Sequence, residues 1–251
     1  MKKYLLIIFL ITHIQVFSQE SPESIFNAAN EQYKQEKFDN AIALYQKIES
    51  NGYESSAVFY NIGNAYFKLR KYPKATLYYE KSILIEPGNN NTKYNLAKAR
   101  MYNIDKVDEI PEFIIKHWSY KIINILTSNS WAIISIVTFL MALLLLLVYF
   151  LSMQISIKRA AFYCSIFLLF ITFTSFYFSF KEKNTIEKNN AAIIMSPTVT
   201  VRSSPQSTGT NLFIIHEGTK VYIVGKLDNW YEIKLGDGKQ GWLPTSDLET
   251  I

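Results

Sequence analysis

Few residues in this chain could carry out catalysis, and their spacing keeps them apart. The three histidines, His13, His117 and His216, are widely separated, and no His-Glu-x-x-His or paired-cysteine spacing occurs. The single cysteine, Cys164, lies in an apolar run, where a Cys/His nucleophile pair is not expected. These residue types therefore predict no catalytic residue, no metal site and no bound cofactor.

Two further patterns could suggest chemistry but have simpler explanations. The stretch Gly236-Asp237-Gly238 is too short for a phosphate-binding loop and is typical of a hairpin turn. Neighbouring charges such as Glu80-Lys81 are expected to be solvated on a helix surface. We therefore expect a protein that binds partners and is not an enzyme.

Composition and charge exclude two other classes of protein. The chain has 251 residues, of which 49% are hydrophobic and 19% charged, which excludes an intrinsically disordered chain. The net charge is +5, but the segments Ser21–Ile110 and Ala191–Ile251 carry only +1 and −1. The positive charge lies beside apolar runs, so it indicates membrane topology, and we expect no nucleic-acid partner.

The first residues have the pattern of a secretory signal peptide, residues 1–18. Lys2 and Lys3 precede the apolar run Tyr4–Thr12, and cleavage is expected before Gln19. The alternative is an anchor that stays uncleaved.

Two uncharged runs, 131–151 and 160–180, predict transmembrane helices in a lipid bilayer. The eight residues Ser152–Arg159 between them require an antiparallel hairpin. Export by the signal peptide would place the flanking segments outside, with Lys158 and Arg159 in a cytoplasmic turn. Three lysines that follow the second run argue for the opposite orientation.

The segment 22–103 contains an internal repeat of 34 residues. This shift aligns Phe38–Ala41 with Tyr72–Ala75 and Tyr45 with Tyr79. The copy with Gly63, Tyr66, Ala75, Tyr79 and Pro87 resembles a tetratricopeptide repeat (TPR), which implies stacked antiparallel helix pairs. The copies are 22–55, 56–89 and a partial third, 90–103. Small residues at Ala29, Gly63 and Ala97 would let neighbouring helices approach closely, while the tyrosines fill the space between them.

Repeat-related residues on the first helix of each pair would form three rows. They are Phe26, Tyr60 and Tyr94; Tyr33, Phe67 and Met101; and Asn30, Asn64 and Lys98. The TPR resemblance implies that this face lines a groove for a peptide or partner helix, with amide groups bonding an extended backbone. The alternative is that some of these aromatic residues pack against a neighbouring helix or Tyr102.

The residues 108–127 predict an amphipathic helix that begins near Pro111. Such a helix could lie at the membrane interface, or it could cap the repeats.

The last part, 191–251, changes to short β-type runs separated by turns. Five strands are predicted, at Ala191–Met195, Thr198–Arg202, Lys220–Leu227, Trp230–Leu235 and Gly241–Pro244. That number suits a small closed barrel. The stretches Val199–Pro205, Glu217–Thr219, Asn229–Ile233 and Gly241–Leu243 resemble a bacterial SH3 (SH3b) domain.

Related SH3b domains often bind cell-wall peptides, so Trp230, Tyr231 and Trp242 are possible ligand-binding residues. The alternative is that Trp242 belongs to the barrel core, covered by Leu243 and Leu248, with Trp230 partly over it.

The predicted fold class is multidomain: an α-solenoid, a two-helix transmembrane hairpin and a small all-β SH3-like barrel. This order resembles the BatE-like membrane proteins of the Bacteroidetes aerotolerance operon. The resemblance implies an accessory scaffold in the cytoplasmic (inner) membrane, with both soluble domains on the periplasmic side. Its implied partners are von Willebrand A-domain membrane proteins and a MoxR-type ATPase. The alternative is a protein that senses or tethers the cell wall by binding peptidoglycan.

Overall fold

The computed structural model describes residues 21–107 and 122–251. The chain divides into two compact units, one ending at Tyr53 and the other beginning at Glu54, and each is described by itself. The predicted signal peptide 1–18 lies outside the described residues, as do residues 108–121 of the predicted amphipathic helix.

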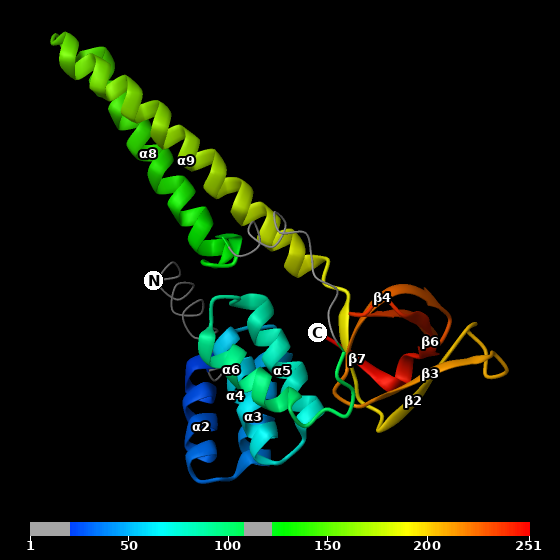
Figure 1. The fold of residues 1–251 in the computed structure, drawn as a ribbon. Helices are drawn as coiled ribbons and strands as arrows, with labels where there is room; N and C mark the ends of the chain where they lie inside the picture. The colour runs from blue at the N-terminus through cyan, green and yellow to red at the C-terminus, as the bar shows by residue number, and fades with distance from the viewer. Residues whose placement is uncertain (1–20, 108–121) are drawn as a thin grey trace, which may run out of the picture. The chain divides into compact units, whose positions relative to one another are not determined.

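Five helices form the helical repeat region, and their bounds repeat with the sequence. The first unit contains α2, Pro22–Lys34, and α3, Phe38–Ser50. The second begins with α4, Ser56–Lys68, α5, Tyr72–Ile85, and α6, Asn90–Arg100 (Figure 1). The 34-residue shift carries α2 onto α4 and the start of α3 onto the start of α5. The turn inside each pair repeats as well, because Glu36 and Arg70 both have positive φ, at 60° and 59°.

The polar residues that begin α2 and α6 act as helix caps. The Ser21 hydroxyl accepts the backbone N–H of Ser24, and the Asn89 side chain accepts that of Thr92. Pro22 occupies the first turn of α2, where a missing N–H costs nothing.

Small residues allow close helix packing at two of the three predicted positions. Ala29 is fully buried, and a Cβ placed on Gly63 would lie 2.6 Å from the Tyr79 ring. Ala97 is exposed instead, so the prediction for that position is wrong. The reason is that no second helix follows α6 in the described residues up to Val107 to cover this face.

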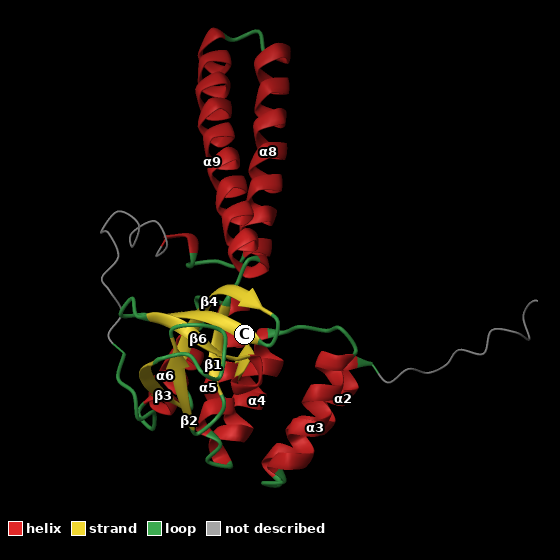
Figure 2. Cartoon of the chain, turned by 90° about the vertical axis from the view of Figure 1, so that its right-hand side faces the viewer, coloured by secondary structure: helices red, strands yellow, loops and turns green. Residues whose placement is uncertain are grey.

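Two long apolar helices follow, α8, Ser128–Leu151, and α9, Ile155–Glu187. They run antiparallel, as Figure 2 shows, with a connection of only Ser152–Gln154. Lys158 and Arg159 therefore lie in the first turns of α9, and their predicted place in the turn is wrong. The helix starts earlier because Ile155 and Ile157 extend the apolar pattern, and the backbone N–H of Lys158 already bonds the Gln154 carbonyl at 3.0 Å.

Hydroxyl groups join α8 to α9 along the seam. The Ser128 hydroxyl donates to the Ser179 carbonyl at 2.9 Å, and the Ser135 hydroxyl donates to the Thr172 carbonyl at 3.2 Å. Small polar residues are typical of contacts between helices in membranes.

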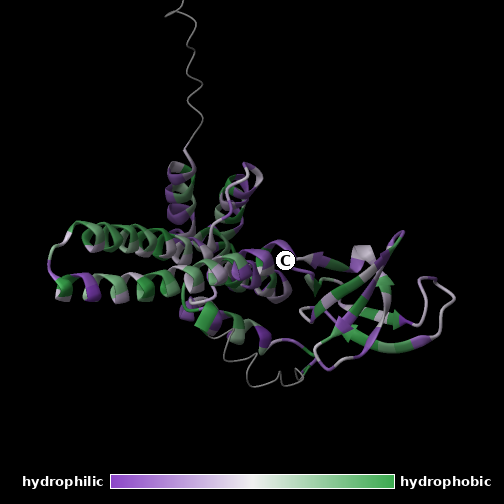
Figure 3. Cartoon of the chain, turned by 90° about the horizontal axis from the view of Figure 1, so that it is seen from above, coloured by the Kyte–Doolittle hydropathy of each residue, from purple (hydrophilic) through white to green (hydrophobic). Residues whose placement is uncertain are grey.

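Many large apolar side chains of this pair are exposed, and Figure 3 shows both helices mainly in the green of hydrophobic residues. In the most apolar window of each helix, 11% of α8 and 22% of α9 is buried. Core helices of soluble proteins are mostly buried, so these two helices are by length and composition suited to cross a membrane.

The C-terminal sheet has seven antiparallel strands in the order β3-β2-β6-β5-β4-β1-β7. Their bounds are β1 Ala191–Ile194, β2 Thr198–Arg202, β3 Asn211–His216, β4 Lys220–Leu227, β5 Trp230–Leu235, β6 Gln240–Pro244 and β7 Leu248–Thr250. The sequence-based prediction lacked β3 and β7. β7 has only three residues after a short 3₁₀ turn, too few for an alternating pattern.

The interior of the sheet is built from aliphatic side chains. The fully or nearly buried members are Ala192, Ile194, Val199, Val201, Ile215, Val221, Ile233, Leu235, Leu243 and Leu248. On β2, β5 and β6 they alternate with less buried residues, which is the period-2 pattern of a sheet with one buried face, whereas all four residues of β1 are buried.

Candidate functional site

In the first unit, the predicted groove residues lie on α2. The Tyr45 hydroxyl donates to the Asn30 amide oxygen at 2.5 Å, and the Phe26 and Tyr45 ring centroids are 5.8 Å apart. Tyr33 packs edge-on against Phe38 at 5.2 Å. Asn30 and Tyr33 also line a hollow on the surface of α2. These side chains therefore support the helix pair and still reach its surface.

The second unit repeats this hydrogen bond and extends it. The Tyr79 hydroxyl donates to the Asn64 amide oxygen at 2.8 Å, at the same 15-residue separation as Asn30 and Tyr45. The Asn95 amide donates both to that oxygen, at 2.9 Å, and to the Tyr60 hydroxyl, at 3.1 Å. The amide oxygen of Asn64 on α4 thus accepts hydrogen bonds from both α5 and α6. The amide nitrogen of Asn64 can still donate a hydrogen bond to a ligand.

Phe67, the last of the predicted groove residues on α4, is less available for contact with a ligand. Phe67 packs edge-on against Tyr72 at 5.4 Å and Tyr102 at 6.1 Å. Tyr102 in turn stacks on Tyr72, with centroids 3.8 Å apart and planes within 4°. Phe67 belongs to an aromatic cluster that closes the turn between α4 and α5.

The most accessible predicted residues lie on α6. Tyr94, Ala97, Lys98 and Met101 are all exposed, and their spacing of i, i+3, i+4 and i+7 puts them on one face. Tyr94 is 60% exposed and Met101 74% exposed, and the Lys98 ammonium lies 4.5 Å from the Tyr94 ring centroid. We call this set the α6 stripe. It offers an aromatic ring, a thioether and a cation side by side.

The three predicted residues of the sheet do not share a face. Tyr231 packs against the buried core, while Trp242 lies between the buried Gly241 and Leu243 and faces the other way. Trp242 pairs with Glu232 across β5 and with Arg202 across β2. Trp230, two residues before Glu232, shares that outer face.

Sequence reasoning missed the contact between the repeat and the sheet in the second unit. Glu80 on α5 was expected to be solvated, but it is 6% exposed. Its carboxylate pairs with Arg100 on α6 and, at 2.8 Å, with Lys220 on β4. The prediction that Glu80 is solvated was wrong because its second cationic partner, Lys220, lies 140 residues further along the chain.

Asp105, just after α6, forms the second part of this contact. Its carboxylate accepts the His216 backbone N–H at 2.6 Å and the Thr219 hydroxyl at 2.9 Å, and contacts the His216 Nδ1 at 3.0 Å. Partial burial alone would raise the pKa of Asp105, but these hydrogen bonds outweigh it and hold the pKa below its usual value. Ionised Asp105 therefore stabilises this contact.

A tight turn brings the sheet against the same segment. Gly218 has φ +83°, and a side chain there would collide with Asn103. The Asn103 amide donates to the Gly218 carbonyl at 2.8 Å, and Val107 packs against the core of the sheet. We call these contacts of Glu80, Asn103 and Asp105 with residues 216–220 the repeat–sheet junction. A glycine turn in 217–219 was visible in the sequence, but its partner was not.

Comparison with known families identifies both modules. Residues 56–89 match the tetratricopeptide repeat model, and residues 197–249 match the bacterial SH3 domain model. The chain carries a TPR and an SH3b domain. A search of curated proteins finds no match. TPRs suggest binding of proteins, and bacterial SH3 domains suggest binding of peptidoglycan, and both are typically non-catalytic.

No metal centre emerges from the part of the chain that the structure describes, since it contains no group of three or more His, Cys, Asp or Glu able to hold an ion. Cys164 is exposed on α9.

Proposed function

We propose that this chain is a membrane-anchored adaptor that binds a protein partner on its TPR helices outside the cytoplasm. The observation that carries the proposal is the repeat–sheet junction. Glu80 and Asp105 precede the two apolar helices, whereas Lys220 and His216 follow them, and they are in direct contact. A hairpin that crosses the bilayer twice returns the chain to the side it left, as this contact requires.

Cysteine labelling tests this topology. In a Cys164→Ser background, Ser207→Cys and Asn51→Cys should react with a membrane-impermeant maleimide in intact cells. Met153, 96% exposed between α8 and α9, should react as Met153→Cys only after the membrane is permeabilised. Labelling of Ser207→Cys and Asn51→Cys from opposite sides of the membrane would contradict the proposed topology.

The partner surface proposed is the α6 stripe, together with Asn64 of the same unit. A cation beside an exposed ring and a flexible thioether suits an amphipathic segment that carries acidic and apolar residues. The resemblance to BatE-like proteins suggests a von Willebrand A-domain membrane protein of the same operon, and a role in an aerotolerance-type complex. A cleaved signal peptide and a periplasmic location belong to the same proposal.

Co-purification from membranes tests the partner surface. Tyr94→Ala, Lys98→Ala and Met101→Ala together should abolish recovery of the von Willebrand A-domain partner. These residues are exposed, so the repeat should remain folded. Lys93→Ala, on another exposed position of α6, is the matched control and should recover the partner normally. Equal recovery with the triple variant would contradict the assignment.

A second function, tethering to or sensing of peptidoglycan, is favoured by the outer face of the sheet. Trp230, Trp242 and Arg202 are only half-buried there, although large aromatic rings usually pack inside. Aromatic side chains that are partly exposed on the surface of a sheet can stack on a peptide or a sugar. Sedimentation of the detergent-solubilised chain with purified peptidoglycan should decrease for Trp242→Ala. Absence of the wild-type chain from the pellet would remove this function.

A further inference from the structure

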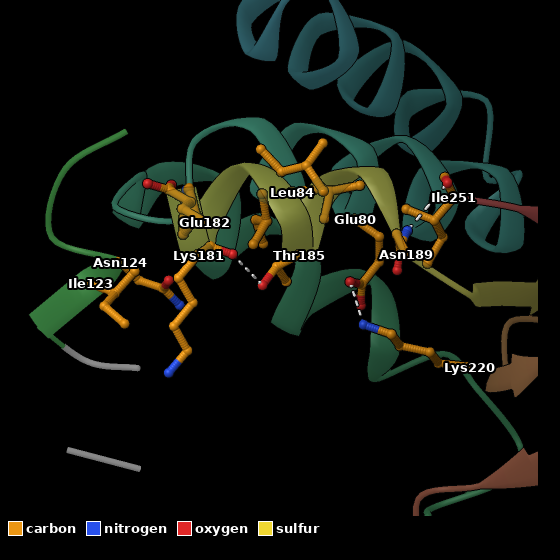
Figure 4. A pocket seen from close by; sticks show the side chains of 13 residues that line it. Glu80, Leu84, Ile123, Asn124, Lys181, Glu182, Thr185, Asn189, Lys220 and Ile251 are labelled. Carbon is orange, nitrogen blue, oxygen red and sulfur yellow. Dashed lines mark hydrogen bonds and ion pairs between the residues drawn. The ribbon is translucent and has the colours of Figure 1, made fainter. Parts of the chain in front are cut away.

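A cavity of about 180 Å³ lies where the repeat, the end of α9 and the C-terminus meet in the second unit. Its volume is about six times the ~30 Å³ that one water molecule occupies in the liquid. Aliphatic side chains line much of it, namely Ile83, Leu84, Ile123, Ile186 and Ile251. The polar lining includes Glu80, Lys220, Lys181 and Glu182 (Figure 4).

The two carboxylates of this cavity differ in their partners. Glu80 is already neutralised by Arg100 and Lys220, and Figure 4 shows its ion pair with Lys220 at one end of the cavity. Glu182, toward the other end, is 4% exposed, and neither of its oxygens has a hydrogen-bond partner among the described residues. A buried carboxylate without a donor is strongly unfavourable. Glu182 thus lacks a donor among the described residues, and a positively charged donor from outside them would satisfy its carboxylate.

A metal ion does not fit this site. Calcium takes six to eight oxygen ligands and magnesium an octahedral set, but among the described residues that line the cavity only Glu182 has carboxylate oxygens without a partner. An ammonium group fits better, since it carries one charge and three N–H donors that a single carboxylate can accept.

The position of Glu182 along α9 identifies the source of the ammonium group. The uncharged stretch from Ala160 to Phe180 spans about 31 Å as a helix, close to the ~30 Å hydrocarbon core of a bilayer. Glu182 lies two residues beyond Phe180, so it is about 3 Å past the end of that stretch, at the depth of lipid headgroups. Lys181, which lines the same cavity, provides positive charge for a neighbouring phosphate.

We propose that the cavity beside Glu182 binds the headgroup of an ethanolamine phospholipid, with the Glu182 carboxylate accepting its ammonium group. This site rests on the proposed membrane anchor. It would fix the repeat and the sheet against the membrane surface through one lipid. A choline headgroup has the same charge but no N–H donor, so it cannot satisfy the carboxylate oxygens.

Native mass spectrometry of the full chain in detergent tests this proposal. The delipidated protein is incubated with ethanolamine or choline phospholipids that have identical acyl chains. We expect about tenfold tighter binding of the ethanolamine lipid, the factor that ~1.4 kcal/mol of hydrogen bonding gives. Glu182→Gln should bring the ratio close to one. Glu187→Gln, on the same helix and exposed, should leave it unchanged.

Three results would overturn the proposal. They are equal binding of both lipids by the wild type, an unchanged preference in Glu182→Gln, and equally tight binding of soluble glycerophosphoethanolamine, which would identify the ligand as a free amine. Should the variant fold poorly, the wild type provides a second measurement. A hydrophobic carbodiimide should modify Glu182 in choline-lipid vesicles and less in ethanolamine-lipid vesicles. Equal modification would contradict the site.

The maleimide labelling of Met153→Cys separates this site from the anchor itself. Correct labelling with no headgroup preference removes the lipid site and leaves the anchor standing. Incorrect labelling removes both.

Discussion

The ion pair of Glu80 with Lys220 gives the sharpest test of the repeat–sheet junction. Its side chains are 7% and 25% exposed, and its oxygen–nitrogen distance is 2.8 Å. Losing one partner of a buried pair costs about 3–5 kcal/mol. Arg100 still pairs with Glu80 in Lys220→Met, so we expect a smaller loss, about 2 kcal/mol, similar to a hydrogen bond to a charged group.

A double-mutant cycle isolates this interaction from other effects of each substitution. Glu80→Gln, Lys220→Met and the double variant are compared in the full chain in detergent. The free energy of opening is measured by hydrogen exchange of the β1 and β4 amides, with peptides resolved by mass spectrometry. We expect a coupling energy of about 2 kcal/mol.

The control pair lies in the turn between β5 and β6. Lys239 and Asp237 are 2.9 Å apart, but their side chains are 63% and 31% exposed. Water screens such an exposed ion pair, so its double-mutant cycle should give a coupling energy of about 0.5 kcal/mol. Equal coupling energies in the two cycles would mean that water reaches Glu80 and that the junction is not packed.

Three further predictions concern single positions. Gly63→Ala should destabilise the repeat by about 1–2 kcal/mol in denaturant unfolding, because its Cβ would overlap Tyr79; unchanged stability would mean that Tyr79 can move. The pKa of Asp105 in the folded protein is below the ordinary aspartate value of about 3.9, so ionised Asp105 stabilises the fold. This stabilisation is complete above pH ~3.9 and is lost as the pH falls through the pKa of the folded state. The protection of the residue 216–220 amides, relative to their intrinsic exchange rate at each pH, should therefore fall in acid for the wild type. In Asp105→Asn this protection should be lower already at neutral pH and should change little with pH. Tyr231→Ala should lower the melting temperature of the sheet more than Trp242→Ala does, since Tyr231 packs on its core; the reverse order would place Trp242 inside.

The features that sequence predicted well are those that depend on near neighbours. A 34-residue repeat is sufficient to predict two helix pairs, because a small residue and a tyrosine 16 residues apart, Ala29 with Tyr45 and Gly63 with Tyr79, recur with the period. The uncharged runs predicted α8 and α9 because twenty apolar residues have few alternatives to a helix in a membrane. The structure extends both helices at their ends, where boundary residues such as Ile155 have weaker preferences.

The features that sequence could not predict depend on residues far apart. Nothing near Glu80 distinguishes it from a solvated helix carboxylate, since its burial is caused by Lys220 and by the sheet that carries it. Asp105 and His216 are 111 residues apart and separated by both apolar helices. Glu182 stands between two lysines just after the second uncharged run, a pattern typical of exposed charges, and yet it is buried. In each case the tertiary partner, and not the local pattern, decides the environment.

The helix α6 connects the two proposed roles of the soluble part. Its exposed stripe ends at Met101, and the residue directly before it, Arg100, pairs with Glu80 inside the repeat–sheet junction. A partner that tilts α6 when it binds the stripe must move Arg100, and Glu80 would then rely on Lys220 alone. Because Lys220 belongs to the sheet, the sheet would be held more tightly or would shift with α6. We therefore expect binding at the repeat to change the coupling between Glu80 and Lys220, which the Glu80 cycle can measure with and without partner.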